Sequence, residues 1–118
     1  MDTFLIKTEK TITRQEGDTA GISILVPTPP NGIDLDTYDA TFVVVNSDGV
    51  EIIRKESFSS VPGITITDQT IDIPLYVDDT TTYAGEHRWE LQLSNATPEV
   101  ITIGRGDFII IAQIITNP

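Results

Sequence analysis

The stretch YDATFVVVNSDGVEIIRKE, residues 38–56, decides the fold class of this chain. Its first half is rich in β-branched and aromatic side chains, which pack well on a pleated sheet. Asn46-Ser47-Asp48-Gly49 is typical of a tight turn, because glycine adopts a positive φ without steric cost. The stretch therefore predicts an antiparallel hairpin with strands at residues 38–46 and 50–56.

The first strand of this hairpin carries apolar side chains on both of its faces. In an extended strand Phe42 and Val44 point to one side, whereas Val43 and Val45 point to the other. Either the strand lies between two layers of the protein, or its second face docks on a partner chain. The last predicted strand raises the same two alternatives at three isoleucines: Ile109, Ile111 and Ile115.

The composition extends the β prediction to the whole chain. Of its 118 residues, 43 are isoleucine, valine or threonine, whereas alanine and leucine together number 11. We expect short strands separated by turns, as in a β-sandwich or small barrel, within a single domain spanning residues 1–118. Besides the hairpin, the predicted strands are residues 4–14, 20–26, 64–67, 71–75, 86–94, 100–103 and 108–115.

Proline and glycine predict where strands stop. The proline-rich segment at residues 27–30 cannot lie inside a sheet, so we expect a stiff surface loop there that could serve as a docking element. Pro74 indicates that its strand is an edge strand or ends at that point. Gly104 and Gly106 favour a turn or bulge before the last strand. At most one short helical turn is expected, near residues 78–84, with Asp78 or Asp79 as its cap.

Charge and cysteine content exclude several function classes. The formal net charge is -11, opposite to the basic surface that nucleic-acid binding and anionic membranes require. The chain has no cysteine, so disulfides and thiolate chemistry are excluded. The longest apolar run, residues 108–112, is far too short to cross a membrane. Residues 1–7 resemble no targeting signal, and we expect synthesis in a cytoplasm.

The sequence offers little support for catalysis, and we expect no enzyme activity and no catalytic residue. His87 is the sole histidine, and we expect it to face solvent, because Glu86 and Arg88 beside it point to the opposite face. None of the serines lies in a nucleophile elbow: Ser23, Ser47, Ser57, Ser59, Ser60 and Ser94.

Three further patterns receive structural interpretations. Asp34, Asp36 and Asp39, and separately Asp78 and Asp79, lack the spacing of a calcium loop, so we assign no metal ligand and read them as loop charge. Arg105-Gly106-Asp107 matches an adhesion tripeptide, yet turn chemistry accounts for each of its residues. The two glycines around Arg105 precede a strand and not a helix, so we expect no phosphate loop and no cofactor.

The order of these motifs resembles a known family. Gly17-Asp18-Thr19 precedes a strand, Asp34-Leu35-Asp36-Thr37-Tyr38 introduces the next, and Tyr83-Ala84-Gly85 comes before Trp89-Glu90-Leu91. This progression, with Gly104-Arg105-Gly106 near the end, resembles the immunoglobulin-like β-sandwich domains of tailed-bacteriophage structural proteins. The N-terminal domain of the phage baseplate upper protein is an example of that family.

The resemblance implies an antiparallel, immunoglobulin-like sandwich of eight or nine strands in a non-enzymatic virion protein. Such a protein would be a tail or baseplate adaptor, or a head accessory, decoration or fibre-attachment protein. Its partners would be other virion proteins and further copies of itself, with no nucleic acid and no membrane. The acidic charge would place it on the outside of the particle, away from the genome.

A second class of function remains open at this point. The chain could be a secreted bacterial module that binds carbohydrate or mediates adhesion, and this binding could depend on calcium. Sugar binding would need exposed aromatic rings, and the candidates are Tyr38, Tyr76, Tyr83 and Trp89, of which Trp89 fits the core better.

Overall fold

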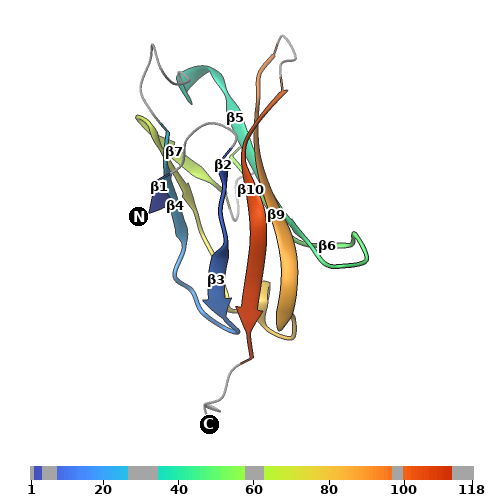
Figure 1. Ribbon diagram of the computed structural model, residues 1–118. Coiled ribbons are helices and arrows are strands. Elements are labelled where there is room, and N and C mark those ends of the chain that lie inside the picture. The colour runs from blue at the N-terminus through green and yellow to red at the C-terminus, as the bar shows by residue number, and fades with distance from the viewer. Residues whose placement is uncertain (1, 4–7, 27–34, 58–62, 97–99, 113–118) are drawn as a thin grey trace.

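The computed structural model describes residues 2–3, 8–26, 35–57, 63–96 and 100–112, which form two packed β-sheets (Figure 1). The smaller sheet contains, in spatial order, β1 (Asp2–Thr3), β4 (Ile22–Leu25), β8 (Thr70–Ile73) and β7 (Thr65–Thr67). The larger sheet contains β2 (Thr8–Glu9), β10 (Val100–Ile111), β9 (Gly85–Ser94), β5 (Asp39–Val45) and β6 (Glu51–Glu56), with β3 (Ile12–Gln15) also paired to β10. The helical elements are η1 (Leu35–Thr37) and α1 (Val77–Thr80).

This strand order is that of an immunoglobulin-like sandwich. With the strands lettered along the chain, β1, β4, β8 and β7 take the places A, B, E and D of one sheet. In the other sheet β10, β9, β5 and β6 take the places G, F, C and C′. The predicted all-β sandwich is confirmed, and α1 supplies the predicted helical turn, whereas η1 is a second turn that the sequence did not indicate.

The N-terminal segment is divided between the two sheets: β1 belongs to the smaller sheet, and β2 and β3 belong to the larger one. The sequence did not reveal how these three strands pair. β1 runs parallel to β4, and both β2 and β3 run parallel to β10. All other pairs between named strands are antiparallel. The expected purely antiparallel sandwich is therefore wrong for this N-terminal segment, because its partners lie far away in sequence and leave no local pattern.

Glycine and proline marked two strand boundaries in the sequence, and the structure bears out one of the two alternatives at each. Of the turn or bulge expected at Gly104 and Gly106, the turn is absent: β10 continues through these residues, with a bulge-like irregularity in register between Thr102 and Gly104. β8 ends at Ile73, as Pro74 requires, but it is an inner strand between β4 and β7.

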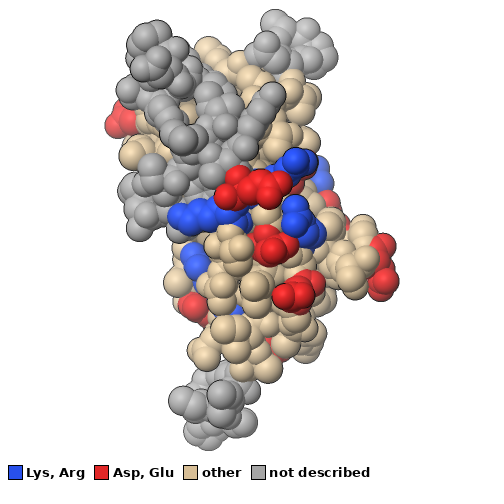
Figure 2. Space-filling view, in the orientation of Figure 1, with Lys and Arg blue, Asp and Glu red and all other residues tan. Residues whose placement is uncertain are grey.

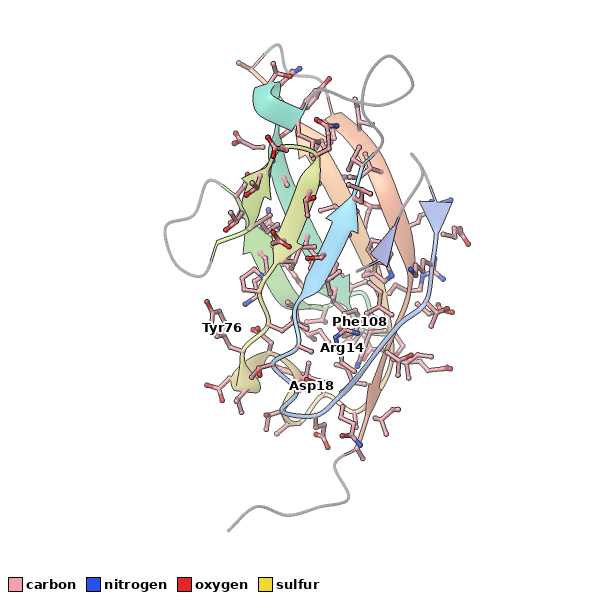
Figure 3. The ribbon with its side chains drawn as sticks, turned by 90° about the vertical axis from the view of Figure 1, so that its left-hand side faces the viewer. Arg14, Asp18, Tyr76 and Phe108 are labelled. Atoms are coloured by element: carbon pink, nitrogen blue, oxygen red, sulfur yellow. The ribbon has the colours of Figure 1, made fainter. Side chains whose placement is uncertain are left out.

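The core lies between the sheets and is built by alternate residues of their strands. Phe42 stacks near Trp89 with ring centroids 5.9 Å apart, and Phe108 meets the Phe42 ring edge-on at 6.3 Å. Figure 3 shows Phe108 in the interior, seen from the side of the smaller sheet. Isoleucines dominate the opposite wall of this core, which includes Ile22, Ile24, Ile71 and Ile73. No helix in the described part of the chain is long and apolar enough to cross a membrane.

One backbone carbonyl ties the N-terminal segment to this core. The indole Nε1 of Trp89 donates a hydrogen bond of 2.8 Å to the Lys10 carbonyl, between β2 and β3. The Lys10 amide donates in turn to the Arg105 carbonyl at 3.0 Å. A Cβ atom at Gly106 would overlap the backbone of Lys10. Glycine is therefore required at position 106 by close approach of the backbone, not by a turn.

A buried ion pair joins β6 to α1 at the edge of the sandwich. Lys55 points inward from β6 with 2% of its side chain exposed, and its Nζ lies 2.8 Å from Asp79 Oδ2. The same carboxylate oxygen accepts the Tyr76 amide at 2.7 Å. The Lys55 ammonium also lies 4.7 Å from the centre of the Tyr76 ring. The pair thus orients the connection between the two sheets.

Replacing Gly106 tests the close approach. Gly106→Ala forces the Lys10 backbone away from β10 and should lower the free energy of unfolding by about 2–4 kcal/mol in urea titration. Gly49→Asn is the matched control, since Gly49 has φ +80° with open space around it and asparagine tolerates that conformation. The control should stay within about 0.5 kcal/mol of the parent chain. Equal losses in the two variants would contradict the close-approach explanation.

The buried pair can be tested by removing its two charges in turn. Lys55→Met leaves the Asp79 carboxylate without its cation and should cost about 2–3 kcal/mol in the same titration. Adding Asp79→Asn removes that carboxylate but keeps an acceptor for the Tyr76 amide, and should restore about 1 kcal/mol or more. If adding Asp79→Asn lowers the free energy of unfolding further, the loss of stability in Lys55→Met does not arise from the broken ion pair.

Candidate functional site

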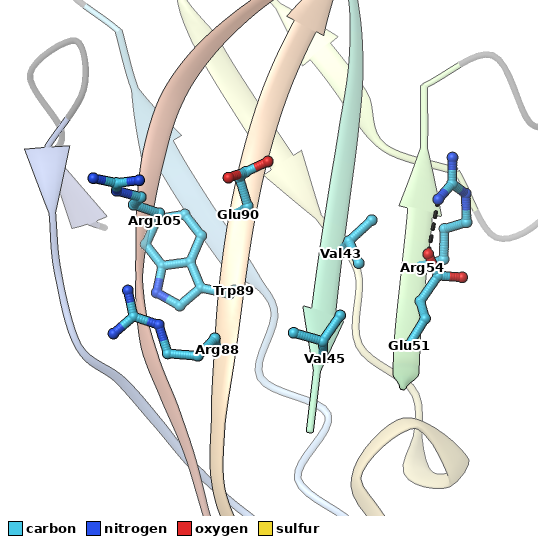
Figure 4. Close-up of a pocket in the computed structure, with 8 residues that line it drawn as sticks. All are labelled: Val43, Val45, Glu51, Arg54, Arg88, Trp89, Glu90 and Arg105. Carbon is cyan, nitrogen blue, oxygen red and sulfur yellow. Dashed lines mark hydrogen bonds and ion pairs between the residues drawn. The ribbon is translucent and has the colours of Figure 1, made fainter. Parts of the chain in front are cut away.

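A depression of the described surface lies on the outer face of the larger sheet. It has a volume of about 450 Å³ and is shallow (Figure 4). Its side chains come from β5, β6, β9 and β10, and they combine two valines with charges of both signs. The residues that line it are Val43, Val45, Glu51, Arg54, Arg88, Trp89, Glu90 and Arg105.

The strand register arranges these residues in two rows across the sheet. The first row is Arg105 on β10, Glu90 on β9, Val43 on β5 and Arg54 on β6. The second row is Asp107, Arg88, Val45 and Glu51 on the same four strands. The rows are two residues apart along β5, β9 and β10, so both project outward from one face. Figure 4 shows the two valines between the charged residues of the neighbouring strands.

Ion pairs within the chain connect most of these charges. Arg88 Nη1 lies 2.9 Å from Asp107 Oδ1, and Arg54 Nη1 lies 2.8 Å from Glu51 Oε1. Hydrogen bonding to Glu51 raises the pKa of the Arg54 guanidinium above its ordinary value, so it stays charged. Side chains of both pairs are about half exposed, and such pairs add little to stability. Their polar atoms therefore remain accessible to a partner.

The outer valines answer a question that the sequence left open. Phe42 and Val44 are fully buried between the sheets, whereas Val43 and Val45 are only half-buried on the outer face. In the described structure no second layer covers this face, so the alternative of docking remains. Ile109 is likewise half-buried and Ile111 is 45% exposed, while Ile115 and the loop at residues 27–30 lie outside the described residues.

Arginine is concentrated on this face. Three of the four arginines of this acidic chain line the depression. Figure 2 shows side chains of both signs interleaved in a band across the middle of the molecule. The sequence could not reveal this grouping, because Arg54, Arg88 and Arg105 come from three different strands.

The adhesion tripeptide lies in the middle of a strand and not on a loop. Gly106 is buried, whereas Arg105 and Asp107 are exposed on the outer face and belong to the two rows. Arg105 Nε lies 3.4 Å from Glu9 Oε1. A flat, paired strand does not present the tripeptide as a projecting loop would.

The expectation that His87 faces solvent is wrong. The ring is half-buried on the same side of β9 as Trp89, because residues two apart share a face. Its Nε2 donates to the Tyr83 carbonyl at 2.6 Å, and its Nδ1 is buried with no partner among the described residues. This hydrogen bond fixes the position of the segment between α1 and β9, which contains Tyr83.

The acidic residues do not gather into a metal site in the described part of the chain. The Asp79 carboxylate forms an ion pair with Lys55 and accepts a hydrogen bond from the Tyr76 amide, while Asp78 is exposed. The Asp39 carboxylate approaches the Ser57 hydroxyl, which donates to it at 3.5 Å. Asp34 lies outside the described residues, and only the backbone of Asp36 is described.

A second depression, of about 440 Å³, lies on the smaller sheet. Ser23 and Asp72 line it and are joined by a hydrogen bond that the Ser23 hydroxyl donates, and Thr65 lies opposite Asp72 in the register. Tyr76 borders it with half of its surface exposed, and points away from the sandwich in Figure 3. Hydroxyls, one carboxylate and one exposed ring thus meet at this site.

The orientation of β5 can be checked with two neighbouring valines. Val44→Thr places a hydroxyl in the core and should cost about 2 kcal/mol in the free energy of unfolding. Val43→Thr makes the same chemical change on the outer face and should stay within about 0.5 kcal/mol. Similar losses at the two positions would show that the outer face is covered.

Comparison with protein-family models and with curated protein sequences finds no match. Among solved structures the chain is similar to CopC from Methylosinus trichosporium OB3b, with 7% identity, a TM-score of 0.42, and coverage of 66% of this chain and 67% of that one. It is also similar to SGBP-B of the mixed-linkage glucan utilization locus of Bacteroides ovatus, solved with a mixed-linkage heptasaccharide. That match has 16% identity, a TM-score of 0.43 and coverage of 91% of this chain, but the chain spans only 20% of that protein.

Proposed function

We propose that this chain is a non-enzymatic structural protein whose outer sheet face binds other proteins. The observation that carries the proposal is the shallow depression in which two half-buried valines are surrounded by charges of both signs. Apolar centres with polar surroundings are typical of protein interfaces, and arginine is enriched there. A shallow face of a rigid sheet also suits a broad partner better than a small molecule.

The assembly that we propose for this binding is the particle of a tailed bacteriophage. The order of motifs along the chain resembles immunoglobulin-like domains of such particles, and the strand order A, B, E, D and G, F, C, C′ agrees with a domain of that type. The role would be a tail or baseplate adaptor, or an accessory protein on the head. The net charge of -11 supports a position on the outside of the particle, away from the genome.

Binding without catalysis is the role that the chemistry of this face supports. The arginines of the depression have carboxylate neighbours in exposed ion pairs, and such pairs orient partners and set specificity. His87, the sole histidine of the chain, holds a backbone carbonyl on the inner side of the sandwich.

Quantitative mass spectrometry of purified particles tests this proposal. The chain should occur in intact virions at a fixed ratio to the major capsid protein, because a structural protein occupies symmetry-related positions. The matched control is a host protein of similar abundance in the lysate, which should be lost during purification. Absence from the particles, or a ratio that varies between preparations, would refute the proposed role.

The second depression favours a different candidate, a carbohydrate-binding module. An exposed tyrosine ring beside a carboxylate and hydroxyls can stack on a sugar and bind its hydroxyl groups. In this case the chain would be retarded on a polysaccharide affinity gel, and Tyr76→Ala would abolish the retardation. Tyr83→Ala is the control, since Tyr83 is exposed but does not line the depression. Added chelator would show whether calcium contributes.

A further inference from the structure

The two rows of the outer face carry opposite patterns of charge. Read across β10, β9, β5 and β6, the first row is positive, negative, apolar and positive: Arg105, Glu90, Val43 and Arg54. The second row is negative, positive, apolar and negative: Asp107, Arg88, Val45 and Glu51. On each strand, a charged residue of one row therefore has the opposite charge in the other row, and the valine on β5 has a second valine.

This inversion has a direct consequence for a two-fold axis. An axis that lies in the plane of the face, runs across the strands and passes between the rows exchanges one row with the other. Each row of one copy then faces the other row of its partner, as an isologous interface requires. Arg105 would face Asp107, Glu90 would face Arg88, Val43 would face Val45, and Arg54 would face Glu51.

The charge of the whole chain makes this face the favourable place for self-association. Two copies with a net charge of -11 repel each other in most orientations. The rows hold three arginines and three carboxylates, so their formal charges cancel. Two copies that meet here bring balanced surfaces together, and each charge meets its opposite.

We infer that the outer face of the larger sheet binds a second copy of this chain, forming a two-fold symmetric dimer centred on Val43, Val45, Arg88 and Glu90. The inference rests on the proposed protein-binding function and names the partner. The strands of the two copies run antiparallel, with the sheets turned by about 30° because each sheet is twisted. Contacts are therefore closest at the centre and looser at Arg54 and Arg105.

The size of the contact sets the expected affinity. Each row crosses four strands, about 14 Å in all, which places the interface at the small end of specific contacts. The arginines and carboxylates also bring exposed ion pairs that are worth little individually. We expect a dissociation constant on the order of 10 µM for the free chain, and a higher effective affinity in a particle where the copies are held together.

Sedimentation velocity across a concentration series provides the test, with charge reversals at the centre. In the Arg88→Glu variant, the new carboxylate at position 88 of each copy faces Glu90 of the other copy. In the Glu90→Arg variant, the new guanidinium group at position 90 of each copy faces Arg88 of the other copy. Each variant should dimerise at least about tenfold more weakly than the parent chain. Mixing the two variants in equal amounts should restore a dimer, because position 88 of one then meets its opposite at position 90 of the other.

The controls separate pairing across the axis from general effects of charge. Asp78→Lys changes the net charge as Glu90→Arg does, at an exposed residue of α1 away from the face, and should leave dimerisation unchanged. Urea titration should show that both reversal variants remain folded. The double variant Arg88→Glu with Glu90→Arg should dimerise on its own.

The outcomes distinguish this inference from the function on which it rests. A parent chain that stays monomeric at concentrations well above the expected constant overturns the dimer, and so does a mixture of the variants that stays monomeric. If the chain is nevertheless found in virions at a fixed ratio, the structural function stands and the face binds a different protein. If it dimerises as predicted but is absent from virions, the dimer stands and the proposed assembly is wrong.

Discussion

The arrangement of the larger sheet depends on the hydrogen bond from the Trp89 indole to the Lys10 carbonyl. Trp89 is the largest side chain of the core, and its ring stacks on Phe42 from the neighbouring strand. An indole N–H buried without an acceptor would be costly, so the backbone at Lys10 must pass close to it. That passage is possible only because Gly106 leaves room on β10. This bond thus fixes the segment between β2 and β3 against Trp89, while both strands pair with β10.

The local part of this fold could be predicted from sequence, because its signals lie within a few residues of one another. Alternation and turn chemistry gave the hairpin of β5 and β6 and the inward direction of Phe42 and Val44. The parallel pairing of β2 and β3 with β10 could not be predicted, because it joins segments about a hundred residues apart in sequence. The close approach of Lys10 to Gly106 could not be predicted for a related reason. Glycine occurs both in turns and where two backbones approach closely. Only the position of the approaching segment, here the backbone at Lys10, shows which of the two applies.

The candidate site illustrates the same limit more sharply. The outward direction of Val43 and Val45 followed from period two, and docking was one of the two alternatives that the sequence left open. The charges around them were not predictable as a group, since their order depends on the register of three strand pairs. A shift by one residue in any pair would move its side chains to the other face. His87 was misplaced within a single strand, although its spacing of two from Trp89 places both on one side.

The irregularity between β5 and β6 is what completes the opposite rows. Glu51 and Arg54 are three residues apart, and in a regular strand they would point to opposite faces. The register shifts between Val44 and Val45, so that Arg54 lies opposite Val43 while Glu51 lies opposite Val45. Both side chains are exposed and pair with each other, while Ile53 and Lys55 turn inward. Bulges often re-aim a side chain in this way. The local distortion therefore brings Glu51 to the outer face beside Arg54, while Lys55, in the regular part of the ladder, points inward to Asp79.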